Sequence, residues 1–119
     1  MFTDLFQIKS HSQEGDSHKW EVALNPGSGI FKVHFPGNPI MPGACQLEMF
    51  RQLACEALGK DVDIASVNNI KYLALIDPRE MLRFTVTETF TEADGITRCA
   101  VVVSSSEKIY TKASLTVKL

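Results

Sequence analysis

Residues 42–59 read PGACQLEMFRQLACEALG and carry helix signals at both ends. Pro42-Gly43 opens the segment, because proline suits the first turn of a helix, and Gly59 suits the left-handed position that follows the last turn. We therefore predict one helix of about 16 residues. Half of its circumference is apolar and is interrupted by Gln46; it holds Leu47, Met49, Phe50, Leu53, Ala54, Ala57 and Leu58. Such a helix has to be largely buried.

The opposite side of this helix is also unlike a solvent-exposed face. Its charged and amide residues are interleaved with small residues, among them Glu48, Arg51, Gln52, Glu56, Ala44, Cys45 and Cys55. We therefore expect this side to be partly covered as well.

Segments that alternate between apolar and polar residues surround the helix and predict strands with one buried face. These strands include Trp20 to Leu24, 81–91, 96–104 and Ile109 to Leu119. Asp94-Gly95 supplies a hairpin turn, so the last third of the chain is predicted to be an antiparallel meander. Segments 4–12 and 64–76 are further expected strands, the second ending at Asp77-Pro78.

The fold class that satisfies these elements is α+β. A mainly antiparallel sheet of five or six strands buries a nearly all-apolar helix best when it curls around that helix. At 119 residues the chain is expected to form a single domain over residues 1–119.

Composition excludes several classes of function. The formal net charge is −2, so no overall basic field exists to attract nucleic acid. No apolar run is long enough for a membrane span and no secretion signal opens the chain, which predicts a cytoplasmic protein.

The three cysteines lack a CxxC spacing and are expected to be reduced and mostly buried. His11 and His18 lie in polar sequence without a third metal ligand, so we expect exposed side chains and no metal site.

The loop before the helix is stiff. After the strand-like segment Phe31 to Val33, residues 34–43 read HFPGNPIMPG, and each of the three prolines fixes its own backbone and restricts the preceding residue. Connecting loops are usually polar, whereas this one contains Phe35, Ile40 and Met41. We interpret it as a functional loop that holds His34 in place.

The helix start lacks a capping side chain. With proline at the first helical position, the preceding Met41 has no acceptor for the amides of Gly43 and Ala44. Such amides favour a ligand oxygen that gains negative charge, for example a carbonyl becoming an enolate.

Glu48 follows one turn later on the predicted helix. On the helical wheel alone it is a solvated residue with a weak surface pair, but His34, the bare amides and the apolar helix together favour an acid–base site.

The pattern His34-x-Pro36-Gly37-x-Pro39-x-x-Pro42-Gly43-x-x-x-x-Glu48-x-x-x-Gln52 resembles the signature of bacterial 3-hydroxyacyl-(acyl carrier protein) dehydratases of the hot-dog fold. Glu48 lies 14 residues after His34, and the stretch Asn69-Ile70-Lys71-Tyr72 resembles the strand that follows the helix in this family. With glutamate at position 48, the chain resembles the branch of this family whose members only dehydrate their substrate.

The resemblance implies a role for each site residue. His34 would take a proton from the carbon next to the thioester carbonyl, and Glu48 would protonate the departing 3-hydroxyl, which requires a dry pocket that raises its pKa. The Gly43 amide would hold the thioester oxygen and Gln52 would orient the Glu48 carboxyl. The remaining predicted substrate-binding residues are Phe35 and Ile40. Neither a metal nor another cofactor is needed.

The expected partners follow from the same resemblance. The family completes its site across a dimer, so we expect a homodimer or a larger oligomer built from dimers, in which His34 of one subunit meets Glu48 of the other. The substrate is an acyl thioester on acyl carrier protein or coenzyme A. Both carriers stay open, because Leu73-Ala74-Leu75 stands where the family commonly has basic residues. Alternative functions are a hot-dog thioester hydrolase, which gives His34 no role, and a non-catalytic acyl-binding subunit.

Overall fold

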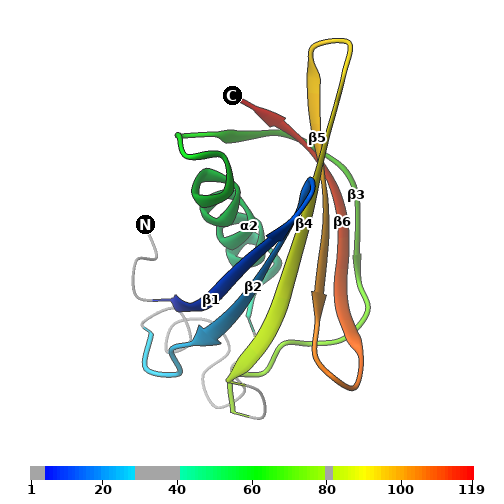
Figure 1. Cartoon of the computed structure of the whole chain (residues 1–119). Coiled ribbons are helices and arrows are strands. Elements are labelled where there is room, and N and C mark those ends of the chain that lie inside the picture. Colours follow the sequence, from blue (N-terminus) through cyan, green and yellow to red (C-terminus); the bar gives the residue numbers. More distant parts are fainter. Residues whose placement is uncertain (1–4, 29–40, 80–81) are drawn as a thin grey trace.

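A computed structural model describes residues 5–28, 41–79 and 82–119. These residues form, in chain order, β1 Phe6–Glu14, β2 Ser17–Leu24, α2 Gly43–Leu58, β3 Asp63–Tyr72, β4 Arg83–Ala93, β5 Ile96–Ser104 and β6 Ile109–Lys118 (Figure 1). The six strands make one sheet of order β1-β2-β4-β5-β6-β3, in which every neighbouring pair is antiparallel.

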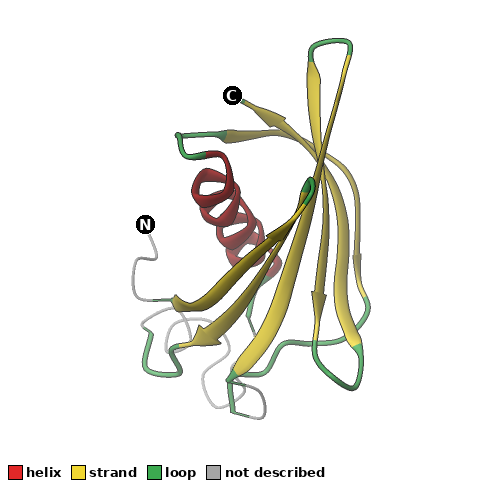
Figure 2. Cartoon of the chain, viewed as in Figure 1, coloured by secondary structure: helices red, strands yellow, loops and turns green. Residues whose placement is uncertain are grey.

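The sheet curls around α2 without closing into a barrel (Figure 2). This arrangement confirms the predicted α+β class and the curled sheet around one long helix. The helix has the expected length of 16 residues, and Gly59 ends it with a φ of 69°, a left-handed conformation that glycine adopts without steric cost.

The predicted meander is also confirmed. Strands β4, β5 and β6 are consecutive neighbours in the sheet. At the β4–β5 hairpin, Asp94 and Gly95 have φ values of 55° and 75°. These positive values are those of a two-residue turn that matches the twist of the strands it joins.

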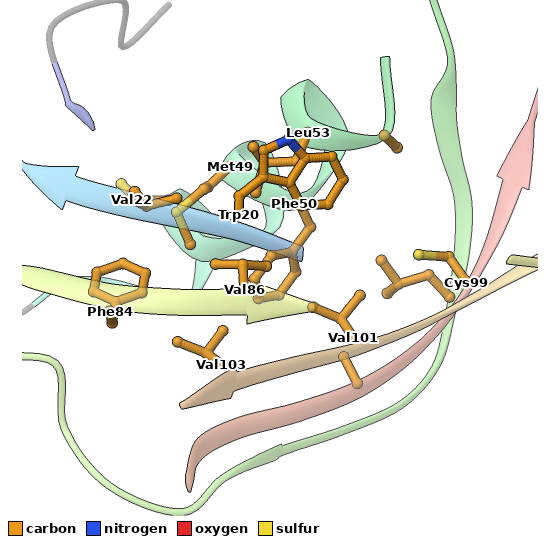
Figure 3. Packing of buried hydrophobic residues seen from close by; sticks show 14 of the residues in the cluster. Trp20, Val22, Met49, Phe50, Leu53, Phe84, Val86, Cys99, Val101 and Val103 are labelled. Carbon is orange, nitrogen blue, oxygen red and sulfur yellow. The ribbon is translucent and has the colours of Figure 1, made fainter. Parts of the chain in front are cut away.

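The core lies between the concave face of the sheet and α2. Trp20 and Val22 on β2 stand opposite Val86 and Phe84 on β4, and the same face continues through β5 and β6. Figure 3 shows this face packed against the helix. The core includes Trp20, Val22, Met49, Phe50, Leu53, Phe84, Val86, Cys99, Val101, Val103 and Leu115, all buried.

Two predicted boundaries need correction. The helix begins at Gly43, with Pro42 as its N-cap rather than its first residue. Strand β3 ends at Tyr72, not before Asp77, because the amides of Leu73 and Ala74 both donate to the carbonyl oxygen of Tyr110 instead of continuing the ladder. The strand-like segment Phe31 to Val33 lies outside the described residues.

The prediction of an exposed His18 was wrong. It lies on β2 on the same face as Trp20, is 5% exposed, and stacks with both Trp20 and His11, which also stack on each other. Its Nδ1 is 2.9 Å from Nε2 of His11, and burial lowers the pKa of His18. The sequence neighbours of His18 are polar, so they did not indicate that its side chain lies on the inward face of the strand.

The cysteines are free as expected: Cys45 and Cys99 are buried and Cys55 is half-buried.

Candidate active site

The first turn of α2 is uncapped, as the sequence predicts. Pro42 has no side-chain acceptor, and its carbonyl oxygen receives the first helical bonds from the amides of Cys45 and Gln46, at 3.0 and 3.1 Å. The amides of Gly43 and Ala44 precede these bonds and therefore have no acceptor within the helix. This end of the helix offers two donors and the positive end of its dipole.

A hollow of about 230 Å³ opens beside this first turn. Its lining is almost entirely apolar and comes from the start of α2 and from the segment that follows β3: Met41, Pro42, Gly43, Gln46, Tyr72, Ala74, Leu75 and Ile76. Backbone donors thus adjoin an apolar space, which is the combination that an acyl thioester requires.

Tyr72 is a residue of this hollow to which sequence analysis gave no role in the site. The missing side chain of Gly43 makes room for the ring of Tyr72. A Cβ atom at position 43 would lie 2.8 Å from Cζ of that ring. The pairing of β3 with β6 brings the end of β3 to the helix start, and no local sequence pattern reports such a contact.

Gln46, the one polar residue within the apolar arc of the helix, is buried. Its Oε1 accepts a hydrogen bond of 2.7 Å from the hydroxyl of Thr111 on β6, which is also buried. This bond pairs the Thr111 hydroxyl with the amide oxygen of Gln46 and ties the first turns of α2 to the sheet.

Glu48 lies one turn further along α2, with its side chain 17% exposed. Three hydrogen bonds from the Arg51 guanidinium reach its carboxylate. Nε lies 3.2 Å from Oε1 and 3.0 Å from Oε2, and Nη2 lies 2.7 Å from Oε1. Gln52 contributes a longer bond of 3.4 Å from Nε2 to Oε1. The predicted contact between Gln52 and Glu48 is therefore present, but Arg51 makes the shorter contacts.

The expected rise in the pKa of Glu48 is not what the chain shows. The hydrogen bonds from Arg51 lower the pKa of Glu48, and they outweigh the opposing effect of burial. The cause is local: the Arg51 guanidinium meets the carboxylate with two nitrogens at once.

The remaining predicted site residues, His34, Phe35 and Ile40, lie outside the described residues. The described part of the site therefore consists of the uncapped helix start, the apolar hollow, and Glu48 with Arg51 and Gln52.

Comparison with protein families places residues 10–111 in the family described as ApeI-like, ApeI dehydratase. The chain belongs to the ApeI-like dehydratase family. The family resemblance that the loop and helix motif indicated is thereby confirmed, and the family is one of hydro-lyases.

Individual relatives of this ApeI-like chain carry the name 3-hydroxyacyl-(acyl-carrier-protein) dehydratase FabZ. The chain is 29% identical over 113 residues to the FabZ of Lactobacillus helveticus, an alignment that covers 78% of this chain and 75% of the relative. It is 34% identical over 69 residues to the FabZ of a Caulobacter species, covering 50% of this chain and 42% of that relative. With Ligilactobacillus salivarius FabZ the alignment spans 53% of the relative, so with several relatives it covers about half of their length.

Solved structures confirm the hot-dog fold. The dehydratase heterocomplex ApeI:P from Xenorhabdus doucetiae aligns with a TM-score of 0.77 at 15% identity, covering 95% of this chain and 97% of the other. A mutant thioesterase from Pseudomonas aeruginosa aligns with a TM-score of 0.66 at 13% identity, covering 94% and 78%. The helix formed by the described residues is not long and apolar enough to cross a membrane.

Proposed function

We propose that this ApeI-like chain removes water from a 3-hydroxyacyl thioester on acyl carrier protein and produces the trans-2-enoyl thioester, in fatty acid or related acyl-chain biosynthesis. The FabZ relatives support both the reaction and the carrier. The three free cysteines fit a reducing compartment, so we place the protein in the cytoplasm.

One structural observation carries this proposal: an uncapped helix start adjoins an apolar hollow, and a carboxylate follows on the same helix. The amide of Gly43 would receive the thioester oxygen as it gains charge, because an N–H group at a helix start favours an oxyanion. The apolar hollow, together with Phe35 and Ile40 of the loop, would hold the carbons next to the thioester.

The two catalytic groups we propose are His34 and Glu48. His34 takes the proton from the carbon next to the thioester carbonyl, because a neutral imidazole is a competent base near pH 7. Glu48, ionised beside Arg51, accepts a hydrogen bond from the 3-hydroxyl and orients it. The imidazolium of His34 then gives this proton to the 3-hydroxyl as the bond between C3 and that oxygen breaks, and water leaves. The electrons of the broken C–H bond form the double bond.

A single assay separates this lyase from a thioester hydrolase with the same fold. The reverse reaction is followed by incubating the protein with an enoyl thioester, while free thiol is measured in parallel. We expect hydration without release of thiol. Release of thiol without hydration would favour the hydrolase, and neither reaction would favour an acyl-binding subunit.

A matched pair of substrates tests the carrier. The same acyl group is offered on acyl carrier protein and on coenzyme A, over a series of chain lengths. We expect a higher kcat/KM with the carrier protein at the preferred length. Equal values for the two carriers would contradict the proposed role of the carrier protein.

We also propose a homodimer, in which His34 of one subunit meets Glu48 of the other. Two features support it. Glu48, Arg51 and Gln52 lie on the side of α2 outside the buried core, where each is half-buried. The sheet edge β3 is mostly exposed, with Val67 and Tyr72 at 41% and 49%, and an open edge strand offers unpaired backbone groups to another strand.

Subunit mixing tests this shared site directly. His34→Ala and Glu48→Gln are each expected to be inactive, whereas a mixed dimer contains one site with both native residues. We therefore expect activity to return after the two variants are denatured and refolded together. A mixed dimer that is isolated through a different affinity tag on each variant and shows no activity would contradict a site shared between subunits.

A further inference from the structure

Arg51 holds the carboxylate of Glu48 in a forked contact. Nε and Nη2 approach the two oxygens at 2.7 to 3.2 Å, so both sides of the carboxylate are engaged by one planar group. A guanidinium fixes the plane of a carboxylate in this way, whereas a point charge such as an ammonium does not.

The other side of the guanidinium is anchored away from Glu48. Nη1 of Arg51 lies 3.4 Å from the carbonyl oxygen of Val62, just before β3, and 3.6 Å from Sγ of Cys55. The same sulfur accepts a bond of 3.3 Å from the amide of Val62. Arg51 is therefore held at both ends, between the catalytic helix and the start of β3.

The other ion pairs in the described residues are more exposed, including Arg79–Asp77, which is also forked, with contacts of 3.1 and 2.9 Å. In Arg79–Asp77 and Arg83–Glu21 the arginine side chains are 52% and 62% exposed, against 32% for Arg51. An ordinary pair one turn apart on a helix contributes about 0.3 kcal/mol to stability and requires no anchoring. The additional contacts of Arg51 thus point to a role in placing Glu48 rather than in supporting the helix.

We propose that Arg51 is the positioning residue of this site, which fixes the Glu48 carboxylate as a charge-paired acceptor for the substrate hydroxyl. This inference rests on the proposed function and goes beyond it, because it assigns the orienting role to Arg51 instead of Gln52. At 3.4 Å, the Gln52 contact assists but does not set the plane of the carboxylate.

Electrostatics agree with this geometry. The hydrogen bonds from Arg51 lower the pKa of Glu48, and those same bonds raise the pKa of Arg51. Burial of Arg51 opposes this rise, and the carboxylate of Asp63 on β3 adds to it. Glu48 is then ionised throughout the neutral range.

The experiment compares Arg51→Met with Arg51→Lys, which keeps the charge but loses the fork. Arg83→Met is the control, since it removes an arginine from an exposed ion pair on the other side of the sheet. The first readout needs no substrate: the titration of the Glu48 carboxyl in a ¹³C-glutamate-labelled protein, assigned with Glu48→Gln. We expect it to move to higher pH in Arg51→Met and to stay near the native position in the control.

The second readout is the pH profile of enoyl hydration. We expect kcat to fall about 100-fold in Arg51→Met with a smaller change in KM, and the acidic limb of the profile to shift upward. Arg51→Lys should recover the position of the acidic limb but only part of kcat. If Arg51→Met does not fold by circular dichroism, Arg51→Lys alone still tests the fork through its kcat.

Two results would overturn the inference: a Glu48 titration unchanged in Arg51→Met, or native kcat in a folded Arg51→Lys variant. Failure of the proposed function would look different. In that case the native protein would hydrate no enoyl thioester, while the titration would still report whether Arg51 holds Glu48.

Discussion

The ring of Tyr72, at the end of β3, occupies the space in which a side chain at position 43 would lie. Gly43 is the first residue of α2, so this contact joins the helix start to the sheet edge at the apolar hollow. The proposed thioester site therefore depends on a glycine and a tyrosine that are 29 positions apart in the sequence.

A double-mutant cycle tests this contact. Gly43→Ala should destabilise the native protein, because the new methyl group overlaps the Tyr72 ring. In a Tyr72→Ala background the same change should stabilise it, since alanine is a better helix former than glycine by up to about 1 kcal/mol. Urea unfolding measures the coupling energy, expected at about 0.5–3 kcal/mol. Additive effects would contradict the contact.

The helix–sheet core gives a second prediction. Leu53 is fully buried in the centre of α2 and packs among Trp20 and the inward face of the sheet (Figure 3). Leu53→Ala should lower the free energy of unfolding by about 2–5 kcal/mol. The matched control is Glu56→Ala on the exposed side of the same helix, expected within about 0.5 kcal/mol. Equal effects in urea unfolding would place Leu53 outside the core.

Glu88 on β4 gives a third prediction, on stability. It is fully buried opposite His18, and neither carboxyl oxygen has a hydrogen-bond partner among the described residues. Burial raises the pKa of Glu88 well above its ordinary value of 4.5. The folded state therefore binds the proton of the Glu88 carboxyl more tightly than the unfolded state does. The free energy of unfolding falls as the pH rises above about 4.5 towards the pKa that Glu88 has in the folded state.

Two variants isolate this effect. Glu88→Gln, which cannot ionise, should remove this part of the pH dependence, and Glu88→Leu should stabilise the protein at neutral pH by about 1–3 kcal/mol because a buried polar group without a partner is lost. Urea unfolding over a range of pH provides the measurement. If the native protein instead gains stability relative to Glu88→Gln as the pH rises through this range, the predicted direction of the pH dependence is wrong.

Much of this fold could be predicted from local patterns. Alternation identified the strands, Gly59 marked the end of α2, and Asp94-Gly95 marked the β4–β5 turn, because each depends on near neighbours in sequence. The end of β3 at Tyr72 could not be predicted in this way. It depends on where its partner β6 turns, and the apolar run that follows continues outside the ladder.

The features of the core and of the site that escaped prediction are long-range or competitive contacts. His18 is buried because the sheet register sets it beside Trp20 and opposite Glu88, which its polar sequence neighbours do not reveal. Arg51 and Gln52 both lie within reach of Glu48 on one helix face. Spacing alone could not indicate that the guanidinium would take the carboxylate and lower the pKa of Glu48.

The central claim is that this chain adds and removes water at an acyl thioester through His34 and Glu48. The direct measurement is the hydration of a carrier-bound trans-2-enoyl thioester by the native protein, His34→Ala and Glu48→Gln, with free thiol recorded in the same samples. We predict hydration without thiol release by the native protein, and a loss of about 100-fold or more in each variant. Thiol release without hydration, or undiminished hydration by either variant, would contradict the account.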